Sequence, residues 1–181
     1  MDDGKISVRY ARALMHQADE ERCAEAVYDG LVRLTDNYSL AIQSFNEVLS
    51  NPMVSDTEKL RLLHLAIGEP LHPCLTRFLD FVTEKKRENK IFLIALKYQE
   101  MYRKANRIVR ADVTTAVAPD ERSLDRLRAF VEQTFQCTAE LRVKTDPTLI
   151  GGFTLDIEHE RMDASVAGRL NALKKQLKTE N

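Results

Sequence analysis

The segment YRKANRIVRADVTTAVAPD, residues 102–120, contains a change in the spacing of apolar side chains that decides the fold. Before Asn106, apolar residues recur every three or four positions, which is typical of amphipathic helices. From Val109 to Ala118 they alternate with polar residues, which is typical of a strand with one buried face. The face expected to be buried carries Ala111, Val113, Thr115 and Val117. The change of period predicts two domains, residues 1–105 and residues 106–181.

The first of these domains carries six separate apolar stripes at helical spacing. They cover residues 10–18, 27–38, 41–49, 60–67, 75–82 and 91–102. Asn51-Pro52 ends the third helix, because the residue before a proline is pushed out of the helical region. Ser55 followed by Glu58 forms a capping-box sequence that starts the fourth helix. Six short helices with brief connections predict a compact six-helix bundle.

Residues 106–181 follow the order strand, helix, strand, strand, helix. After the strand at 109–118, a helix is expected through Leu124 and Phe135, with strands over 140–145 and 153–158. We expect Leu141 and Val143 to point inward from the second strand. The final helix carries Val166, Leu170, Leu173 and Leu177 on one face. The whole chain is therefore predicted to be a mostly helical α+β protein, with a small α+β domain after the bundle.

The stretch DPTLIGGF, residues 146–153, places two consecutive glycines behind a turn marked by Asp146-Pro147. No Gly-Lys-Ser/Thr follows, and the next element is a strand rather than a helix. Both observations argue against a phosphate loop or a dinucleotide site. Glycines beside the start of a strand allow a positive φ, a bulge or a close approach of backbones. We interpret the pair as a tight connection, a hairpin between the second and third strands.

Charge and cysteine usage exclude several classes of function. The formal net charge is −1, and 15 of the 27 basic and 16 of the 28 acidic residues precede residue 106, so neither half is basic enough to indicate nucleic-acid binding. Cys23, Cys74 and Cys137 are scattered singly, without a CxxC pair. We interpret them as reduced thiols in the core. No cofactor and no metal is expected.

No catalytic motif is visible either. The four histidines fall on four different elements, with no HExxH spacing and no adjacent nucleophile. The carboxylates between Asp156 and Asp163 and the mixed-sign run Glu84–Glu88 are interpreted as solvated surface. The first ten residues lack the apolar core of a signal peptide, and the longest apolar run, 91–96, is far shorter than the roughly 20 residues of a membrane span. Any association with a membrane is therefore expected to be indirect.

Three local strings resemble the delta subunit of ATP synthase, called the oligomycin-sensitivity-conferring protein in mitochondria. RYARAL at 9–14 is similar to the family's pattern on its first helix. DPTLIGGF at 146–153 and MDASVAGRLNAL at 162–173 resemble its most recognisable segment, where an Asp-x-Ser-Val motif leads into the last helix. The resemblance covers nearly the whole chain.

The resemblance implies a non-catalytic stator subunit of the proton-translocating ATP synthase. Such a subunit joins the catalytic head to the peripheral stalk and resists the torque of the rotor. The family's bundle binds the amino-terminal helix of an alpha subunit between its first and fifth helices. In this sequence those faces carry Tyr10, Ala13, Leu14, Phe78, Leu79 and Val82. The second domain is implied to bind the b subunits of the stalk, and Val166, Leu170 and Leu173 are candidates either for that contact or for the core.

Two further expectations follow. The lack of a targeting segment suggests a bacterial protein that acts peripherally at the cytoplasmic face of the inner membrane, held there by the rest of the complex. The alternative to a stator subunit is a small RNA- or ribosome-associated protein, since helical bundles joined to α+β units also occur there. A basic face and salt-dependent binding would distinguish that alternative.

Overall fold

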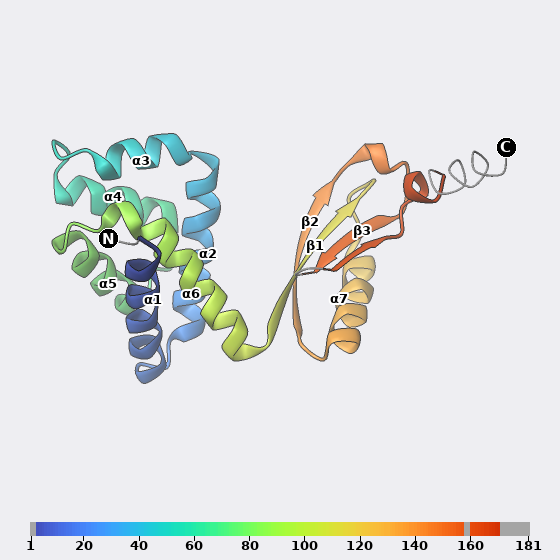
Figure 1. Cartoon of the computed structure of the whole chain (residues 1–181), viewed down its shortest axis with the longest axis horizontal. Helices are drawn as coiled ribbons and strands as arrows, with labels where there is room; N and C mark the ends of the chain where they lie inside the picture. Colours follow the sequence, from blue (N-terminus) through green and yellow to red (C-terminus); the bar gives the residue numbers. More distant parts are fainter. Residues whose placement is uncertain (1–2, 158–159, 171–181) are drawn as a thin grey trace. The chain divides into compact units, whose positions relative to one another are not determined.

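The structure is a computed structural model that describes residues 3–157 and 160–170. The chain divides into two compact units, residues 1–103 and residues 104–181. The first unit is all helical and the second combines a sheet with a helix (Figure 1). The predicted class, mostly helical α+β with a bundle followed by a small α+β unit, is confirmed.

Six α-helices and one short 3-10 helix, η1, build the first unit. They are α1 (Asp3–Glu20), α2 (Ala24–Leu40), α3 (Ile42–Ser50), α4 (Asp56–Ile67), α5 (Pro73–Glu84), η1 (Glu88–Lys90) and α6 (Ile91–Asn106). Helix α2 is central and contacts α1, α3, α4 and α5. Tyr38 on α2 is buried and stacks on Phe45 and Phe92, with 4.7 Å between ring centroids in each pair. Stacked rings fill the core without leaving polar atoms unpaired, since the Tyr38 hydroxyl donates to Asn46 Oδ1 at 2.6 Å.

Local signals set the helix boundaries of the bundle. The predicted capping box is present, because Ser55 Oγ accepts from Glu58 N and Glu58 Oε2 accepts from Ser55 N. Helix α3 ends at Ser50, directly before Asn51-Pro52. Helix α5 starts with Pro73 at its first position, where the missing N–H costs no hydrogen bond.

One connection differs from the sequence prediction. Glu88, in the run interpreted as solvated, is buried, and its Oε1 accepts from Lys59 Nζ of α4 at 2.6 Å. Both side chains are 6% exposed. The last residue of the mixed-sign run therefore forms a buried ion pair that links η1 to α4.

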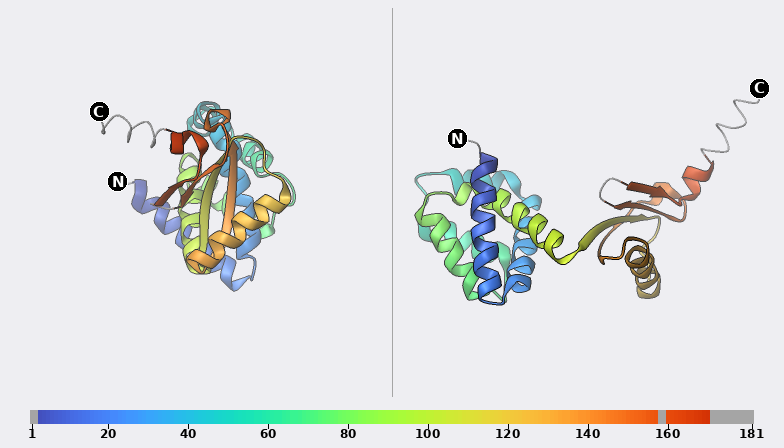
Figure 2. Two further views of the ribbon diagram at one scale, coloured as in Figure 1. Left: turned by 90° about the vertical axis from the view of Figure 1, so that its right-hand side faces the viewer. Right: turned by 60° about the horizontal axis from the view of Figure 1, so that its bottom comes forward.

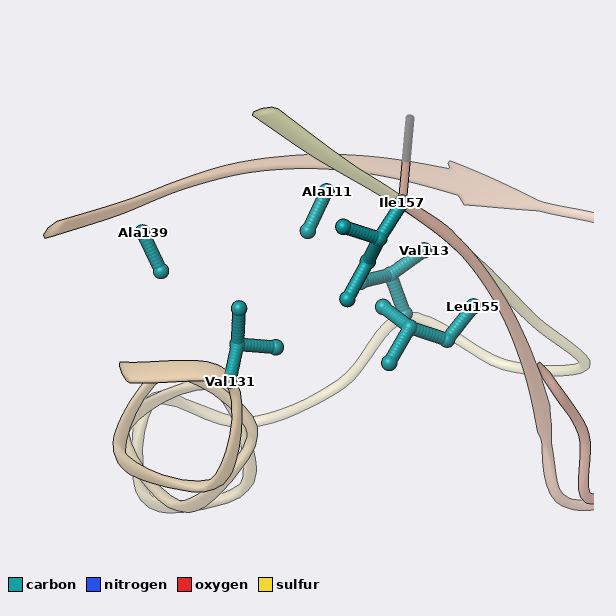
Figure 3. Close-up of a cluster of buried hydrophobic side chains, with 6 residues drawn as sticks. All are labelled: Ala111, Val113, Val131, Ala139, Leu155 and Ile157. Atoms are coloured by element: carbon teal, nitrogen blue, oxygen red, sulfur yellow. The ribbon is translucent and has the colours of Figure 1, made fainter. Parts of the chain in front are cut away.

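The second unit is a four-stranded sheet with a helix on one face. Its elements are β1 (Ile108–Thr115), α7 (Glu121–Phe135), β2 (Thr138–Thr145), the 3-10 helix η2 (Pro147–Leu149), β3 (Phe153–Ile157) and β4 (Glu160–Asp163), followed by a helical turn at 166–170. The strand order is β2-β1-β3-β4, with β1 parallel to β2 and antiparallel to β3. Val131 of α7 points at side chains of the sheet to form the core (Figure 3). The core cluster consists of Ala111, Val113, Val131, Ala139, Leu155 and Ile157.

Several details of this unit correct the sequence prediction. Strand β1 ends at Thr115, and Val117, expected to face inward, is 76% exposed. Val143, also expected to point inward, is exposed because β2 lies at the edge of the sheet. The buried residue of β2 is Ala139. Strand β4 was not predicted, since its residues ERMD show no alternation. It forms by pairing with the free edge of β3.

The glycine pair does not belong to a hairpin, which is a further correction. Strands β2 and β3 lie on opposite sides of β1, so the segment that joins them crosses the end of β1. Gly152 has φ +76°, and a Cβ there would overlap with the Ala164 carbonyl oxygen. A carbonyl oxygen at this spot repels an anion, so a phosphate does not fit. The glycines allow the crossing segment to pack against the residues that begin the final helix.

Candidate functional site

Helices α1 and α5 present an exposed aromatic pair on the bundle. The rings of Tyr10 and Phe81 lie 6.0 Å apart between centroids, and Phe81 is 45% exposed. Two cations flank the pair, with Arg9 5.7 Å from the Tyr10 centroid and Lys85 Nζ 5.6 Å from the Phe81 centroid. Ala13 is exposed one turn further along α1. We call Tyr10, Ala13 and Phe81 with these two cations the α1–α5 surface (Figure 2 shows α1 in dark blue).

The six residues named from the resemblance occupy different positions. Tyr10 is half-buried and Ala13 is exposed, so both are accessible. Leu14, Leu79 and Val82 are fully buried and Phe78 is 5% exposed, so in this structure these four are core residues and are not accessible to a partner. Sequence reasoning missed Phe81, because the stripe it followed on α5 is the one that faces the core. The signal for Phe81 was its position three residues after Phe78, on the next face of the helix.

A groove between α1 and α6, which we call the α1–α6 groove, lies beside this surface. It holds about 370 Å³ and is lined by Gly4, Ser7, Leu93, Leu96, Lys97, Glu100 and Arg103. Leu93 and Leu96 are about as exposed as Phe81. A partner helix that lies on α1 could therefore contact either the aromatic α1–α5 surface or the α1–α6 groove.

The α+β unit has a larger apolar groove, which we call the α7–β3 groove. It holds about 720 Å³ and is lined by four segments: residues 115–119, residues 123–130 of α7, residues 150–153 at the glycine pair and the start of β3, and Met162 of β4. Its exposed apolar side chains are Val117, Phe130, Ile150 and Met162. Arg126 is the one charged residue among the described residues that line it. An apolar concavity of this size fits the apolar face of an amphipathic helix.

Polar contacts near the glycines hold the walls of this groove. Asp146 Oδ1 accepts from Thr148 N at 2.9 Å and from Thr148 Oγ1 at 2.7 Å. Asp163 Oδ1 accepts from Ser165 N at 2.9 Å, and Ser165 Oγ accepts from Gly168 N at 2.9 Å. The hydrogen bonds to these two carboxylates lower the pKa of each aspartate, so both stay ionised at neutral pH. The Asp-x-Ser-Val segment thus caps the final helical turn.

The final helical turn leaves its apolar residues accessible. Val166 is 41% and Leu170 is 45% exposed, so neither is a core residue in this structure. Leu173 lies outside the described residues. The contact interpretation of Val166 and Leu170 is thus the one that their exposure favours.

Groups capable of chemistry are few in the part of the chain that the structure describes. His16, His64 and His72 lie on α1, on α4 and before α5, and His159 lies outside the described residues. One group of potential metal ligands occurs within 3–157 and 160–170, consisting of Glu21, Cys23 and Cys74. Over the same ranges, no helix is both long and apolar enough to cross a membrane.

Comparisons with known proteins agree with the fold and the strings in the sequence. The profile of the family "ATP synthase delta (OSCP) subunit" matches residues 6–177. The ATP synthase subunit delta of Parabacteroides distasonis is 38% identical over 174 residues, with 96% of each chain covered. That of Phocaeicola vulgatus is 35% identical over 179 residues, with 98% of this chain and 96% of the relative covered.

A chain in the mitochondrial ATP synthase hexamer of Toxoplasma gondii has the same fold, with a TM-score of 0.64 and 24% identity over 94% of this chain and 96% of that one. These comparisons give no support to the RNA- or ribosome-associated alternative. The chain belongs to the ATP synthase delta (OSCP) subunit family and is a non-catalytic stator subunit of the ATP synthase, part of its peripheral stalk.

Proposed function

We propose that residues 1–105 bind the amino-terminal helix of an alpha subunit and that residues 106–181 bind the b subunits of the peripheral stalk. The observation that carries the proposal is that each unit has its own exposed apolar surface, the α1–α5 surface and the α7–β3 groove. One chain with two such surfaces can hold the head against the stalk. The assembly would act at the cytoplasmic face of a bacterial inner membrane, attached to the membrane through the rest of the complex.

The α1–α5 surface suits an amphipathic helix with an acidic flank. Its aromatic pair offers flat apolar area, and Arg9 and Lys85 supply positive charge beside it. Aromatic residues at the centre of an interface contribute most of the binding energy. Phe81 is therefore the residue expected to matter most.

The first experiment measures binding of an alpha-subunit amino-terminal peptide to the full chain by calorimetry. Phe81→Asp should weaken binding at least about tenfold, because it places a carboxylate where an apolar contact forms. Leu96→Asp is the matched control, since Leu96 is 40% exposed in the neighbouring α1–α6 groove. If Leu96→Asp weakens binding and Phe81→Asp does not, the α1–α5 assignment is wrong.

The α7–β3 groove is tested with a carboxyl-terminal b-subunit segment. Phe130→Asp should abolish measurable binding, because Phe130 lines the groove and is 45% exposed. Phe135→Asp is the control on the same helix, since Phe135 is 37% exposed but lies outside the groove lining. Equal loss in the two variants would contradict binding in this groove.

A further inference from the structure

Two cysteines far apart in sequence meet a carboxylate at one end of the bundle. Glu21 and Cys23 lie in the connection between α1 and α2, and Cys74 lies in the first turn of α5. One ligand atom from each residue lies within 4.8 Å of the other two. We propose that Glu21, Cys23 and Cys74 form a binding site for a thiophilic divalent cation of the Zn²⁺ class.

The ligand types and their number match such an ion. Zn²⁺ binds sulfur and carboxylate oxygen in tetrahedral sites, and three protein ligands leave a fourth position for water. Each thiol must give its proton to solvent when the metal–sulfur bond forms. Both sulfurs lie at the amino-terminal ends of helices, Cys23 directly before α2 and Cys74 at the second residue of α5, where the helix dipole favours negative charge.

Both thiols lie away from solvent. Burial and the adjacent Cys23 sulfur raise the pKa of Cys74 to about 12. Cys23 is 6% exposed and Cys74 is fully buried. A bound cation would supply the positive charge that two buried thiolates need.

The carboxylate is held by a second set of donors. Glu21 Oε1 accepts from Gln17 Nε2 at 3.1 Å, and Arg77 Nη2 donates to the two carboxylate oxygens at 2.5 and 2.6 Å. These hydrogen bonds lower the pKa of Glu21, and the bond from Arg77 contributes the most. The side chain is therefore a carboxylate at neutral pH. Oε1 accepts two of these bonds and Oε2 accepts one, so Oε2 keeps a lone pair for the cation. Carboxylates that bind metals are commonly oriented in this way by outer hydrogen bonds, which makes Arg77 a positioning residue.

The carboxylate also distinguishes a metal site from a pair of thiols waiting to be oxidised. A disulfide between Cys23 and Cys74 would require an external two-electron oxidant and would make no use of Glu21. A cation uses all three groups without any change of oxidation state. It would also link the start of α2 to the start of α5.

The experiment uses the full chain, reduced with a phosphine that is removed before the metal is added, and Cd²⁺ as the probe. We expect one Cd²⁺ per chain at saturation, an ultraviolet charge-transfer band from two thiolates, and displacement by Zn²⁺. Cys23→Ser or Cys74→Ser should remove most of the band. Glu21→Gln and Arg77→Gln should keep the band but weaken binding about 10- to 100-fold. Cys137→Ser, in the other unit, is the control and should bind as the unchanged chain does.

Several results would overturn the proposal. They are no saturable uptake by the reduced chain, uptake without a thiolate band, or uptake that Cys137→Ser weakens as much as Cys23→Ser does. Formation of a Cys23–Cys74 disulfide with hydrogen peroxide in a chain that takes up no Cd²⁺ would identify a redox pair instead. If the serine variants fail to fold, Glu21→Gln still decides, because its side chain is on the surface. Unchanged affinity in that variant contradicts the site.

Discussion

Removing one member of the buried Lys59–Glu88 pair should destabilise the bundle severely, whereas removing both should not. Lys59→Met leaves the Glu88 carboxylate buried, and its Oε2 already lacks a hydrogen-bond partner among the described residues. Breaking one side of a buried ion pair typically costs about 3–5 kcal/mol. The double variant Lys59→Met/Glu88→Met removes both charges and keeps the volume, so its stability should return to within about 1 kcal/mol of the unchanged chain.

The magnitude follows from distance and burial. At 2.6 Å and an effective dielectric constant of about 20, the attraction between Lys59 Nζ and Glu88 Oε1 is about 6 kcal/mol. Desolvation costs several kcal/mol for each ion, so the net contribution of the intact pair to the stability of the fold is close to zero. A single substitution loses the attraction while one desolvation cost remains. The Lys86–Asp56 pair is the matched control, because its N–O distance is also 2.6 Å while its side chains are 66% and 46% exposed.

The assay is thermal and urea unfolding of the full chain, followed by far-ultraviolet circular dichroism. For a unit of this size, each kcal/mol shifts the melting temperature by about 4–8 °C, so Lys59→Met should lower it by at least about 12 °C. Lys86→Met should change it far less, because solvent screens an exposed pair. The reasoning is refuted if the two single variants behave alike, or if the double variant is as unstable as the sum of its parts.

The remaining predictions concern backbone geometry and helix capping. Gly152→Ala should destabilise the α+β unit by at least about 2 kcal/mol in urea unfolding, because φ is +76° and the new Cβ would meet the Ala164 carbonyl oxygen. Gly68→Ala, at φ +69° and ψ −179° with open space around it, should cost about 1–3 kcal/mol through backbone strain alone, and a smaller cost at Gly152 than at Gly68 would contradict the close-approach argument. Asp120 caps α7 by accepting from Ser123 N at 3.2 Å, and this contact lowers the pKa of the carboxyl. Its stabilising effect is present above the unfolded pKa of about 4 and is lost as pH falls through the lowered folded value. Asp120→Ser should keep the cap and reduce the acid sensitivity of melting, and an unchanged acid profile would show that other groups dominate.

Local signals made much of the bundle predictable. The signals were a proline after Asn51, a capping box at Ser55 and apolar residues at helical spacing. Each affects only residues close to it in the chain, so it can be recognised in a single sequence. The periodicity also separated the helical unit from the α+β unit. Alternation also predicted a strand over 153–158, which the structure shows as β3.

Strand pairing was less predictable, because it depends on residues far away in the chain. Nothing in ERMD indicates β4, which forms since β3 offers an unpaired edge. Val143 alternates as a buried residue would, yet it is exposed because β2 lies at the edge of the sheet. The position of β1 between β2 and β3 turned an expected hairpin into a crossing segment.

The candidate sites divide along the same line. The strings around the glycine pair and the Asp-x-Ser-Val segment pointed to the family, but the groove that the glycines help to form is assembled from four separate segments. On α5, Phe78 and Phe81 are both apolar and three residues apart. Which of them reaches the surface depends on how α1 and α2 pack against that helix. The spacing of apolar residues in the sequence does not contain this information.

By itself, the sequence determined the helical and alternating periods, the local caps and turns, and the strings typical of the family, because these signals act between near neighbours along the chain. Only the tertiary structure decided which apolar residues stay exposed, that Lys59 and Glu88 are buried together, and that Cys23 and Cys74 meet Glu21. Those facts come from contacts between segments that are distant in sequence, and such contacts are fixed by packing of the whole core rather than by any local pattern.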